Sequence, residues 1–252
     1  MPLHLRLLLP AFGLAMGFAL GFIQPLGLLL GAAFIALLLF AQRVLSPPPW
    51  WGLSLLASIA LAAHLLPGFR PWPLWSPRLL SVDAPPYALR LSWDKLLLGL
   101  TLLAWWLGQT HASRTDTRRA WGVALLTLLG IPLLALALGV VGWQVKWPEG
   151  LALWLAVNLG VSVLAEELLF RGLLQTRLIG WLGVWPGILI GALLFGAVHI
   201  PFSPLFAVVA GMAGLGYGLV FHYSGRLSLA IALHGAVNLL HLLLLSYPLR
   251  LA

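Results

Sequence analysis

The chain has 252 residues, of which 62% are hydrophobic and 8% are charged. Soluble domains carry roughly 25% charged residues, so this composition excludes an ordinary water-soluble fold. Cysteine is absent, which excludes disulfides, thiolate nucleophiles and cysteine-ligated zinc or iron–sulfur sites. The formal net charge is +8, but the basic residues are scattered among apolar segments without an aromatic–basic stripe. We therefore expect no nucleic-acid partner and interpret the basic residues as membrane-topology signals.

Nine apolar stretches along the chain predict helices. They are residues 7–23, 26–41, 50–66, 96–107, 120–142, 151–179, 184–200, 204–222 and 227–247. The first follows Arg6 and is interpreted as a retained helix, because no small-x-small cleavage site is clear and further spans follow at once. Leu96–Leu107 is shorter than the roughly 17 residues that a span needs, so we expect it in the membrane interface, anchored by Trp105 and Trp106.

The basic residues favour one topology. If Leu96–Leu107 does not span and the N-terminus is outside, residues 67–119 form one cytoplasmic segment and most basic residues lie inside. We therefore predict an all-α fold: a polytopic transmembrane helix bundle with about eight spans, or nine if every stretch spans. The connection Pro67–Asp94, rich in Pro, Trp and Arg, is expected to be irregular. In either topology the turn near Gly180–Gly183 and the loop around Arg226 are cytoplasmic.

Glycines recur at four-residue spacing in the late stretches. They are Gly183, Gly187 and Gly191 and, separately, Gly214 and Gly218. This spacing lets helices approach closely, so we expect these glycines to serve helix packing.

Two of the six acidic residues, Glu166 and Glu167, are adjacent within the apolar stretch 151–179. A carboxylate at bilayer depth costs about 2.5–3.5 kcal/mol on insertion scales, so it normally faces the bundle interior, has a partner and marks a functional site. Adjacent positions on an α-helix point about 100° apart, which predicts separate roles. Glu167 and Arg171 have the spacing of a helix ion pair, and Glu166 continues a polar stripe with Ser162 and Asn158 at four-residue steps. The alternative is that both carboxylates only stabilise the helix through pairing.

Polar residues also stand on two later helices. His199 closes the apolar stretch 184–200, and the last stretch carries His234 and Asn238 one turn apart, with His241 further along the same face. At about 1.5 Å per residue, Glu166 and His199 lie some 21 and 24 Å from the turn between them, whereas His234 lies only about 13 Å from its own turn. The histidine and asparagine of the last helix could instead only cross-link helices through hydrogen bonds.

Three short motifs stand in order on successive late helices. They are Glu166-Glu167-x-x-x-Arg171, Phe195-x-x-x-His199 and His234-x-x-x-Asn238. Together they resemble the signature of the CAAX prenyl protease and bacteriocin-processing (CPBP, or Abi) family of intramembrane proteases. The similarity covers roughly residues 120–245. It implies a CPBP-like catalytic helix core over residues 120–247, preceded by N-terminal transmembrane helices and a Pro- and Trp-rich loop over residues 1–119, in one compact membrane domain.

Peptide hydrolysis needs an activated water and donors that stabilise the oxyanion. We expect Glu166 to be the general base, with its pKa raised by burial, and His199 to help it position the water; the family resemblance implies the same assignment. His234 and Asn238 would donate to the oxyanion. Glu167 and Arg171 would form a supporting shell.

A metal site is the alternative for these residues. Glu166, His199 and His234 match a catalytic zinc set of two histidines and one carboxylate. The helical motif His-Glu-x-x-His is absent, and the resemblance favours a glutamate mechanism, so no cofactor is expected, with zinc as the alternative.

Other protease chemistries fit less well. An aspartyl type needs two membrane aspartates, whereas Asp83, Asp94 and Asp116 are predicted in loops. A serine type is not expected because Ser224 lies in a loop, next to Gly225.

The sequence therefore predicts an intramembrane endopeptidase that hydrolyses a peptide bond of a membrane-associated or lipidated (CAAX-like) protein or peptide. We expect an integral, multi-pass protein of the bacterial cytoplasmic membrane, in contact with membrane lipid and with a membrane-bound or prenylated substrate. Two alternatives use the same residues differently: a membrane transporter or channel with buried Glu and His, and a non-catalytic bacteriocin-immunity protein.

Overall fold

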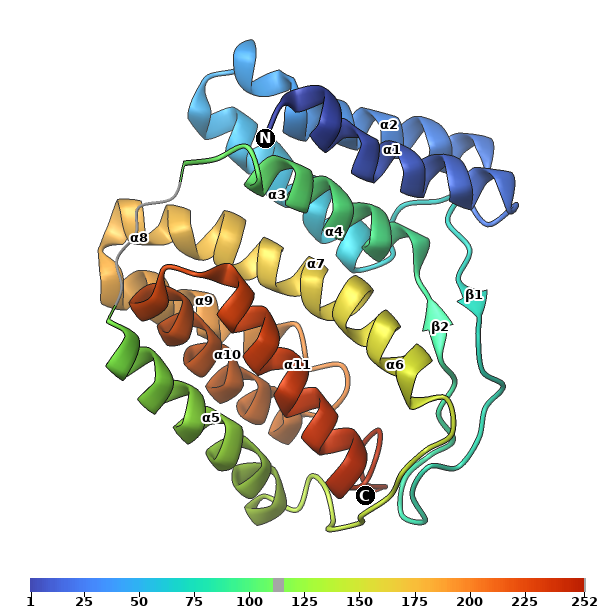
Figure 1. Ribbon diagram of the computed structural model, residues 1–252, viewed down its shortest axis with the longest axis vertical. Helices are drawn as coiled ribbons and strands as arrows, with labels where there is room; N and C mark the ends of the chain where they lie inside the picture. The colour runs from blue at the N-terminus through green and yellow to red at the C-terminus, as the bar shows by residue number, and fades with distance from the viewer. Residues whose placement is uncertain (111–115, 252) are drawn as a thin grey trace. The chain divides into compact units, whose positions relative to one another are not determined.

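The computed structural model describes residues 1–110 and 116–251 (Figure 1). Residues 111–115, inside the predicted cytoplasmic segment 67–119, lie outside this description. Contacts between Cα atoms divide the chain into two compact units. The first unit comprises Met1–Leu74, Arg90–Thr110 and Ala156–Leu169, and the second comprises the described residues of Trp75–Leu89, His111–Leu155 and Phe170–Ala252. The fold is all-α, and each of the nine predicted stretches contains a helix.

The first unit is built from four helices of the N-terminal half and part of a long helix. Its elements are α1 (Leu3–Ala19), α2 (Pro25–Leu39), the 3₁₀ turn η1 (Ala41–Arg43), α3 (Pro47–Ala62), β1 (Trp72–Pro73), β2 (Arg90–Leu91) and α4 (Trp93–Trp106). The two strands pair antiparallel, with Trp72 opposite Leu91. Pro25 and Pro47 begin their helices, where the missing N–H has no intrahelical partner to lose.

Helix α4 is a buried helix of the first unit, and its expected place in the membrane interface stays a prediction. It packs against α1, α2, α3 and α7. Leu98, Leu102 and Ala104 are fully buried and Leu97 is 1% exposed. Protein therefore covers most of the apolar side chains of this 14-residue helix. Asp94, expected in a loop, lies in the first turn of this helix, where the helix dipole favours a carboxylate.

Two backbones meet closely at the start of α2. The Gln24 N–H donates to the Gly68 carbonyl at 2.8 Å, and the Arg70 N–H donates to the Phe22 carbonyl at 2.8 Å. A Cβ on Gly27 would lie 2.4 Å from the Gly68 carbonyl oxygen, and Gly68 itself has a φ of +90°. Only glycine therefore fits at this crossing.

One long helix, Leu151–Leu182, contributes residues to both units. It is not a regular α-helix. Its segments are α6 (Leu151–Val157), the π-helical η2 (Asn158–Val163), α7 (Leu164–Glu167), the π-helical η3 (Leu168–Gln175) and α8 (Thr176–Leu182). The short α7 turn thus stands between two π-helical segments, and such segments occur frequently at functional sites.

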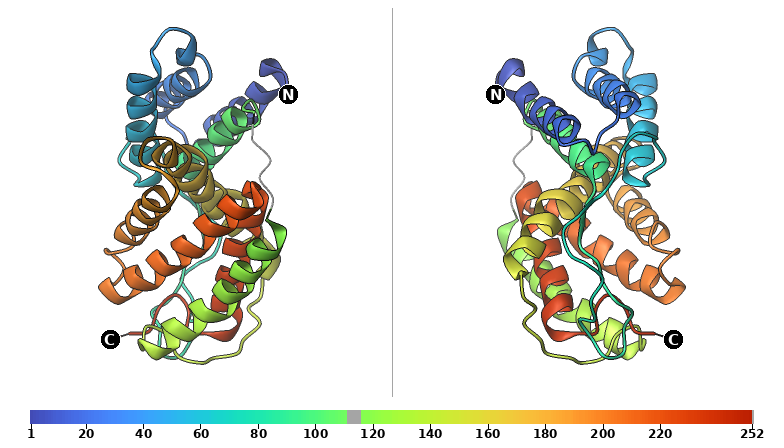
Figure 2. Two further views of the ribbon diagram at one scale, coloured as in Figure 1. Left: turned by 90° about the vertical axis from the view of Figure 1, so that its left-hand side faces the viewer. Right: turned by 90° about the vertical axis from the view of Figure 1, so that its right-hand side faces the viewer.

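The second unit contains the other late helices: α5 (Thr117–Ala137), α9 (Val184–Ala197), α10 (Pro204–Ser224) and α11 (Leu227–Leu244). Helix α10 packs against α5, α9 and α11 (Figure 1 and Figure 2). The two predicted turns are confirmed, because Gly183 and Gly225 have φ angles of +90° and +64° between successive helices. Close packing is confirmed at Gly187 and Gly214, where an added Cβ would lie 2.7 Å from the Ile179 nitrogen and 3.0 Å from the Phe195 ring.

Four helices of the described chain are long and apolar enough to cross a membrane. They are Thr117–Ala137, Leu151–Leu182, Pro204–Ser224 and Leu227–Leu244. Three shorter apolar helices, α1, α2 and α9, accompany them. The protein is therefore an integral membrane protein, while the count of about eight spans stays a prediction.

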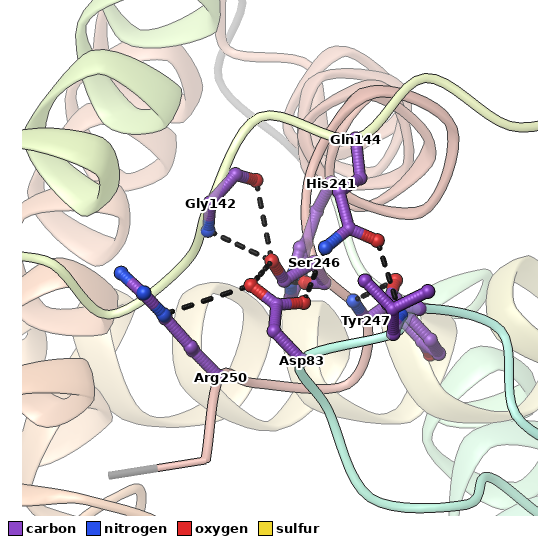
Figure 3. Close-up of polar contacts among 9 residues, drawn as sticks. Asp83, Gly142, Gln144, His241, Ser246, Tyr247 and Arg250 are labelled. Atoms are coloured by element: carbon purple, nitrogen blue, oxygen red, sulfur yellow. Dashed lines mark hydrogen bonds and ion pairs between the residues drawn. The ribbon is translucent and has the colours of Figure 1, made fainter.

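The C-terminal tail of the second unit is held by a polar cluster that we call the tail clasp: Asp83, Gly142, Gln144, Ser246 and Arg250 (Figure 3). The Asp83 carboxylate accepts from Ser246 Oγ at 2.8 Å and from Gln144 Nε2 at 2.6 Å, and Arg250 Nε lies 3.6 Å from it. Ser246 Oγ also accepts from the Gly142 N–H at 2.8 Å. The clasp therefore joins the end of α11 to the loops before α4 and after α5.

Lys146 stands beside the tail clasp and donates to the Leu245 carbonyl. Burial lowers the pKa of this lysine, and the nearby Asp83 carboxylate opposes that effect. The partly buried amine contributes a further hydrogen bond to the same chain end, so the tail is fixed by side chains from two loops.

Replacing Gly27 by alanine should destabilise the first unit. The new Cβ would meet the Gly68 carbonyl oxygen at 2.4 Å, and overpacking of this kind costs about 1–3 kcal/mol. Gly52→Ala is the matched control, since Gly52 is also in a helix of this unit and has nothing within 4 Å of its Cβ position. We expect a lower apparent Tm in detergent for Gly27→Ala and an equal or higher one for Gly52→Ala. Equal melting of the two variants would contradict the close crossing.

Replacing Asp83 by asparagine should loosen the tail. The change removes the charge that two hydrogen-bond donors and Arg250 share, and hydrogen bonds to charged groups contribute about 1.5–3 kcal/mol each. Glu149→Gln, the same carboxylate-to-amide change at an exposed loop position of this unit, is the control. We expect faster proteolysis of the tail and a lower Tm for Asp83→Asn only. A tail equally protected in both variants would show that the clasp does not hold it.

Candidate active site

A mostly apolar cavity of about 70 Å³ lies in the second unit, with walls from α5, α9, α10 and α11. Its polar lining consists of a tyrosine, three histidines and an asparagine: Tyr217, His199, His234, Asn238 and His241. A cavity with a few convergent polar groups in apolar walls is the usual form of a small active site. Three of the four predicted catalytic residues are thus brought together here.

His199 is the second residue after the end of α9, and its N–H donates to the Gly196 carbonyl at 2.9 Å. Its ring Nδ1 lies 2.7 Å from the Phe195 carbonyl oxygen. Because a carbonyl can only accept, this contact assigns the ring proton to Nδ1 and leaves Nε2 as an acceptor. The ring is held from the side by Phe206, at a centroid distance of 5.5 Å.

His234 is 5% exposed and is stacked on Tyr217, with ring centroids 4.6 Å apart and planes 16° apart. It also meets the edge of Phe195 at 5.8 Å, and the His199 ring lies 4.9 Å from the same phenylalanine. The two histidines, predicted at different distances from their turns, therefore share one aromatic neighbour.

The face predicted for the last helix is confirmed, since His234, Asn238 and His241 all line the cavity. His241 Nε2 lies 2.9 Å from the Ser246 carbonyl oxygen, so Nε2 carries the proton and donates. Ser246 is a member of the tail clasp (Figure 3). The clasp therefore fixes one wall of the cavity through this histidine.

Arg171 is 1% exposed and donates from its guanidinium to the Gly214 carbonyl at 2.8 Å. The guanidinium carbon lies 4.6 Å from the Phe195 ring centroid and 5.3 Å from that of Tyr217. These are the two rings that hold His234. Arg171 thus supports the cavity wall through cation–π contacts, which are strongest when desolvated.

Glu166 and Glu167 belong to the first unit, at the end of α7. Glu167 is fully buried, while the Glu166 side chain is 22% exposed. Their different exposure agrees with adjacent positions pointing in different directions. Glu166 Oε1 lies 3.3 Å from Lys95 Nζ of α4.

The regular α-helix assumed around the two glutamates is wrong. Asn158–Val163 before them and Leu168–Gln175 after them are π-helical. A π-helix bonds i to i+5 and not i to i+4, so the four-residue spacings from Ser162 to Glu166 and from Glu167 to Arg171 do not have their α-helical geometry. The pairing of Glu167 with Arg171 stays a prediction.

Two residues of these surroundings were missed in the sequence. Lys95 precedes the apolar stretch 96–107 and was interpreted only as a topology charge, although a lysine in the first turn of a buried helix needs a partner. Tyr217 lies on α10 between Gly214 and Gly218, in a stretch that was interpreted only as a helix-packing pattern. The tyrosine itself could have indicated a polar site, because a buried tyrosine brings a polar hydroxyl into an apolar helix.

Among residues 1–110 and 116–251, no group of three or more His, Asp or Glu side chains is arranged to hold a metal ion. The zinc set of Glu166, His199 and His234 therefore stays an alternative that rests on the sequence.

Comparison with known proteins gives one family match. Residues 148–240 match the family model described as Rce1-like, type II CAAX prenyl endopeptidase Rce1-like. All three motifs of the sequence, with Glu166, His199 and Asn238 among them, fall inside the matched segment. Searches of curated proteins and of solved structures gave no match. The Rce1-like match over residues 148–240 confirms the family resemblance found in the sequence, and it supports a CAAX-type intramembrane protease in general.

Proposed function

We propose that the protein is an intramembrane endopeptidase that hydrolyses a peptide bond of a membrane-associated or lipidated protein, with water activated by Glu166. The observation that carries this proposal is the cavity of the second unit, where His199, His234 and Asn238 converge within the Rce1-like segment. The assignment of Glu166 rests on the family motif and on the chemistry of a partly buried carboxylate.

In the proposed reaction, Glu166 takes a proton from a water molecule while the water oxygen attacks the peptide carbonyl carbon. The Nε2 atom of His199, an acceptor in the tautomer assigned above, accepts a second hydrogen bond from that water. The carbonyl oxygen gains negative charge, which the Asn238 amide and the His234 ring stabilise as donors. The C–N bond then breaks, and the protonated Glu166 gives its proton to the leaving amine.

The proposed substrate reaches the site from the membrane. Most of the cavity lining is apolar, and most of the helices that supply it are apolar enough to span. The matched family is named for CAAX prenyl endopeptidases, so a peptide bond near a lipidated chain end is the proposed target. Membrane lipid and a membrane-bound or prenylated protein are the proposed partners, and the bacterial cytoplasmic membrane is the proposed location.

Glu166→Gln should abolish proteolysis while the protein stays folded. Loss of a general base lowers the rate by about 10² to 10⁴-fold, whereas the amide keeps the size of the side chain. The measurement is cleavage of a farnesylated peptide by the purified protein in lipid, followed by mass spectrometry. Glu149→Gln, exposed in a loop, is the control. Full activity of Glu166→Gln would rule out the glutamate mechanism.

We also propose that the reaction needs no metal or other cofactor. The expected result is full activity after dialysis against a chelator, with substoichiometric zinc in the purified active protein by elemental analysis. Activity that is lost to the chelator and restored by zinc would instead favour the alternative set of Glu166, His199 and His234, in which zinc activates the water.

A further inference from the structure

We propose that Lys95 is a positioning residue for Glu166: its ammonium holds the carboxylate ionised and in one orientation. This inference rests on the proposed function of Glu166 as general base. Lys95 Nζ lies 3.3 Å from Glu166 Oε1, and each side chain is 22% exposed. Lys95 lies outside the Rce1-like segment 148–240, so the family match does not include it.

The first turn of α4, which carries Lys95, is also held by contacts of the neighbouring residue Asp94. Asp94 is 4% exposed; one of its oxygens accepts from the Lys95 N–H at 2.8 Å, and the other lies 2.7 Å from His64 Nδ1. His64 has a φ of +58°, a left-handed conformation that is uncommon outside glycine. Trp93, 1% exposed, packs in the core of the same unit. These contacts of Trp93 and Asp94 thus hold in place the first turn of α4, which carries Lys95.

Helices α4 and α7 also meet closely beyond the ion pair. A Cβ on Gly99 would lie 3.5 Å from the Cβ of Ala165, which is 1% exposed and directly precedes Glu166. Gly99 is four residues after Lys95, one turn along α4. The two contacts, Lys95 with Glu166 and Gly99 with Ala165, therefore fix the same stretch of α7 at adjacent turns of α4.

The chemistry of the pair favours a role in reactivity over one in stability. An ion pair between two largely buried side chains is weak evidence for stability, because the desolvation of both charges offsets their attraction. A cation within about 4–6 Å nonetheless favours the charged form of a carboxylate. A general base must be ionised to take a proton from water, and the neighbouring Lys95 ammonium favours that ionised form.

The first test compares Lys95→Met, which removes the charge, with Lys95→Arg, which keeps it. We expect Lys95→Met to lower kcat by about tenfold or more with KM within about twofold, since the lost interaction acts on the reacting group and not on substrate binding. Lys95→Arg should retain most of the activity. Arg43→Met, which removes a positive charge from an exposed position of the same unit, is the control. Unchanged kcat in Lys95→Met, or a higher kcat, would overturn the proposal.

The absence of cysteine allows a rescue on the folded protein. Lys95→Cys would introduce the single thiol of the chain, and alkylation with 2-bromoethylamine would rebuild a side chain of lysine length with a terminal ammonium. We expect activity to be low in Lys95→Cys and restored by this alkylation, whereas the neutral product of iodoacetamide should stay low. Equal activity of the two alkylated proteins would overturn a role for the charge.

A last measurement does not depend on catalysis. Carbodiimides modify protonated carboxyls in apolar surroundings, so the rate of Glu166 labelling, followed by mass spectrometry, reports its charge state. We expect faster labelling in Lys95→Met than in wild type, Lys95→Arg or Arg43→Met. If the wild-type protein cleaves no peptide but labelling responds in this way, the protease proposal fails, while the part of the Lys95 proposal that concerns the charge of Glu166 stands. Equal labelling in all four proteins would overturn the Lys95 proposal.

Discussion

A polar side chain inside an apolar helix bundle must find its hydrogen-bond partner within the protein, because lipid offers none. In the second unit three such side chains use backbone carbonyls. Arg171 donates to Gly214, Gln175 to Gly218, and His199 to Phe195. The Gln175 contact requires a glycine at position 218, since a Cβ there would lie only 2.6 Å from the Gln175 side-chain oxygen. Gly218, which belongs to what looks like a simple helix-packing pattern along α10, therefore also makes room for the Gln175 side chain.

Phe195 organises the groups that line this cavity. Its ring contacts His199, His234, Tyr217 and the Arg171 guanidinium, with centroid distances between 4.6 and 6.2 Å. Edge-to-face and cation–π contacts of this kind have directional preferences, so they restrict ring orientation as well as position. Because the two histidines are oriented before any substrate arrives, the donors and acceptors of the proposed reaction need little reorganisation. The phenylalanine of the Phe-x-x-x-His motif is thus a physical part of the site and not only a marker of the family.

Much of this arrangement could be predicted from local features of the sequence. Apolar length located all nine helices, left-handed glycines placed the turns at Gly183 and Gly225, and helical periodicity put His234, Asn238 and His241 on one face. What could not be predicted depends on tertiary contacts. The π-helical segments around α7 change the register by packing that no local pattern encodes, and Lys95 meets Glu166 across 71 residues of sequence. The cover of the short α4 by α1, α2, α3 and α7 likewise depends on contacts between distant parts of the chain.

The Glu-Glu-x-x-x-Arg motif joins residues with different surroundings. Glu166 and Glu167 belong to the first unit, where α4 supplies Lys95, and Arg171 belongs to the second, where it contacts α9 and α10. One continuous helix, interrupted by π-helical turns, carries all three residues. Helix α4 contributes a charge next to the proposed base although it lies outside the matched segment. A motif of six residues on one helix consequently has contacts from both halves of the chain, since Lys95 of α4 lies beside Glu166 and helices α9 and α10 contact Arg171.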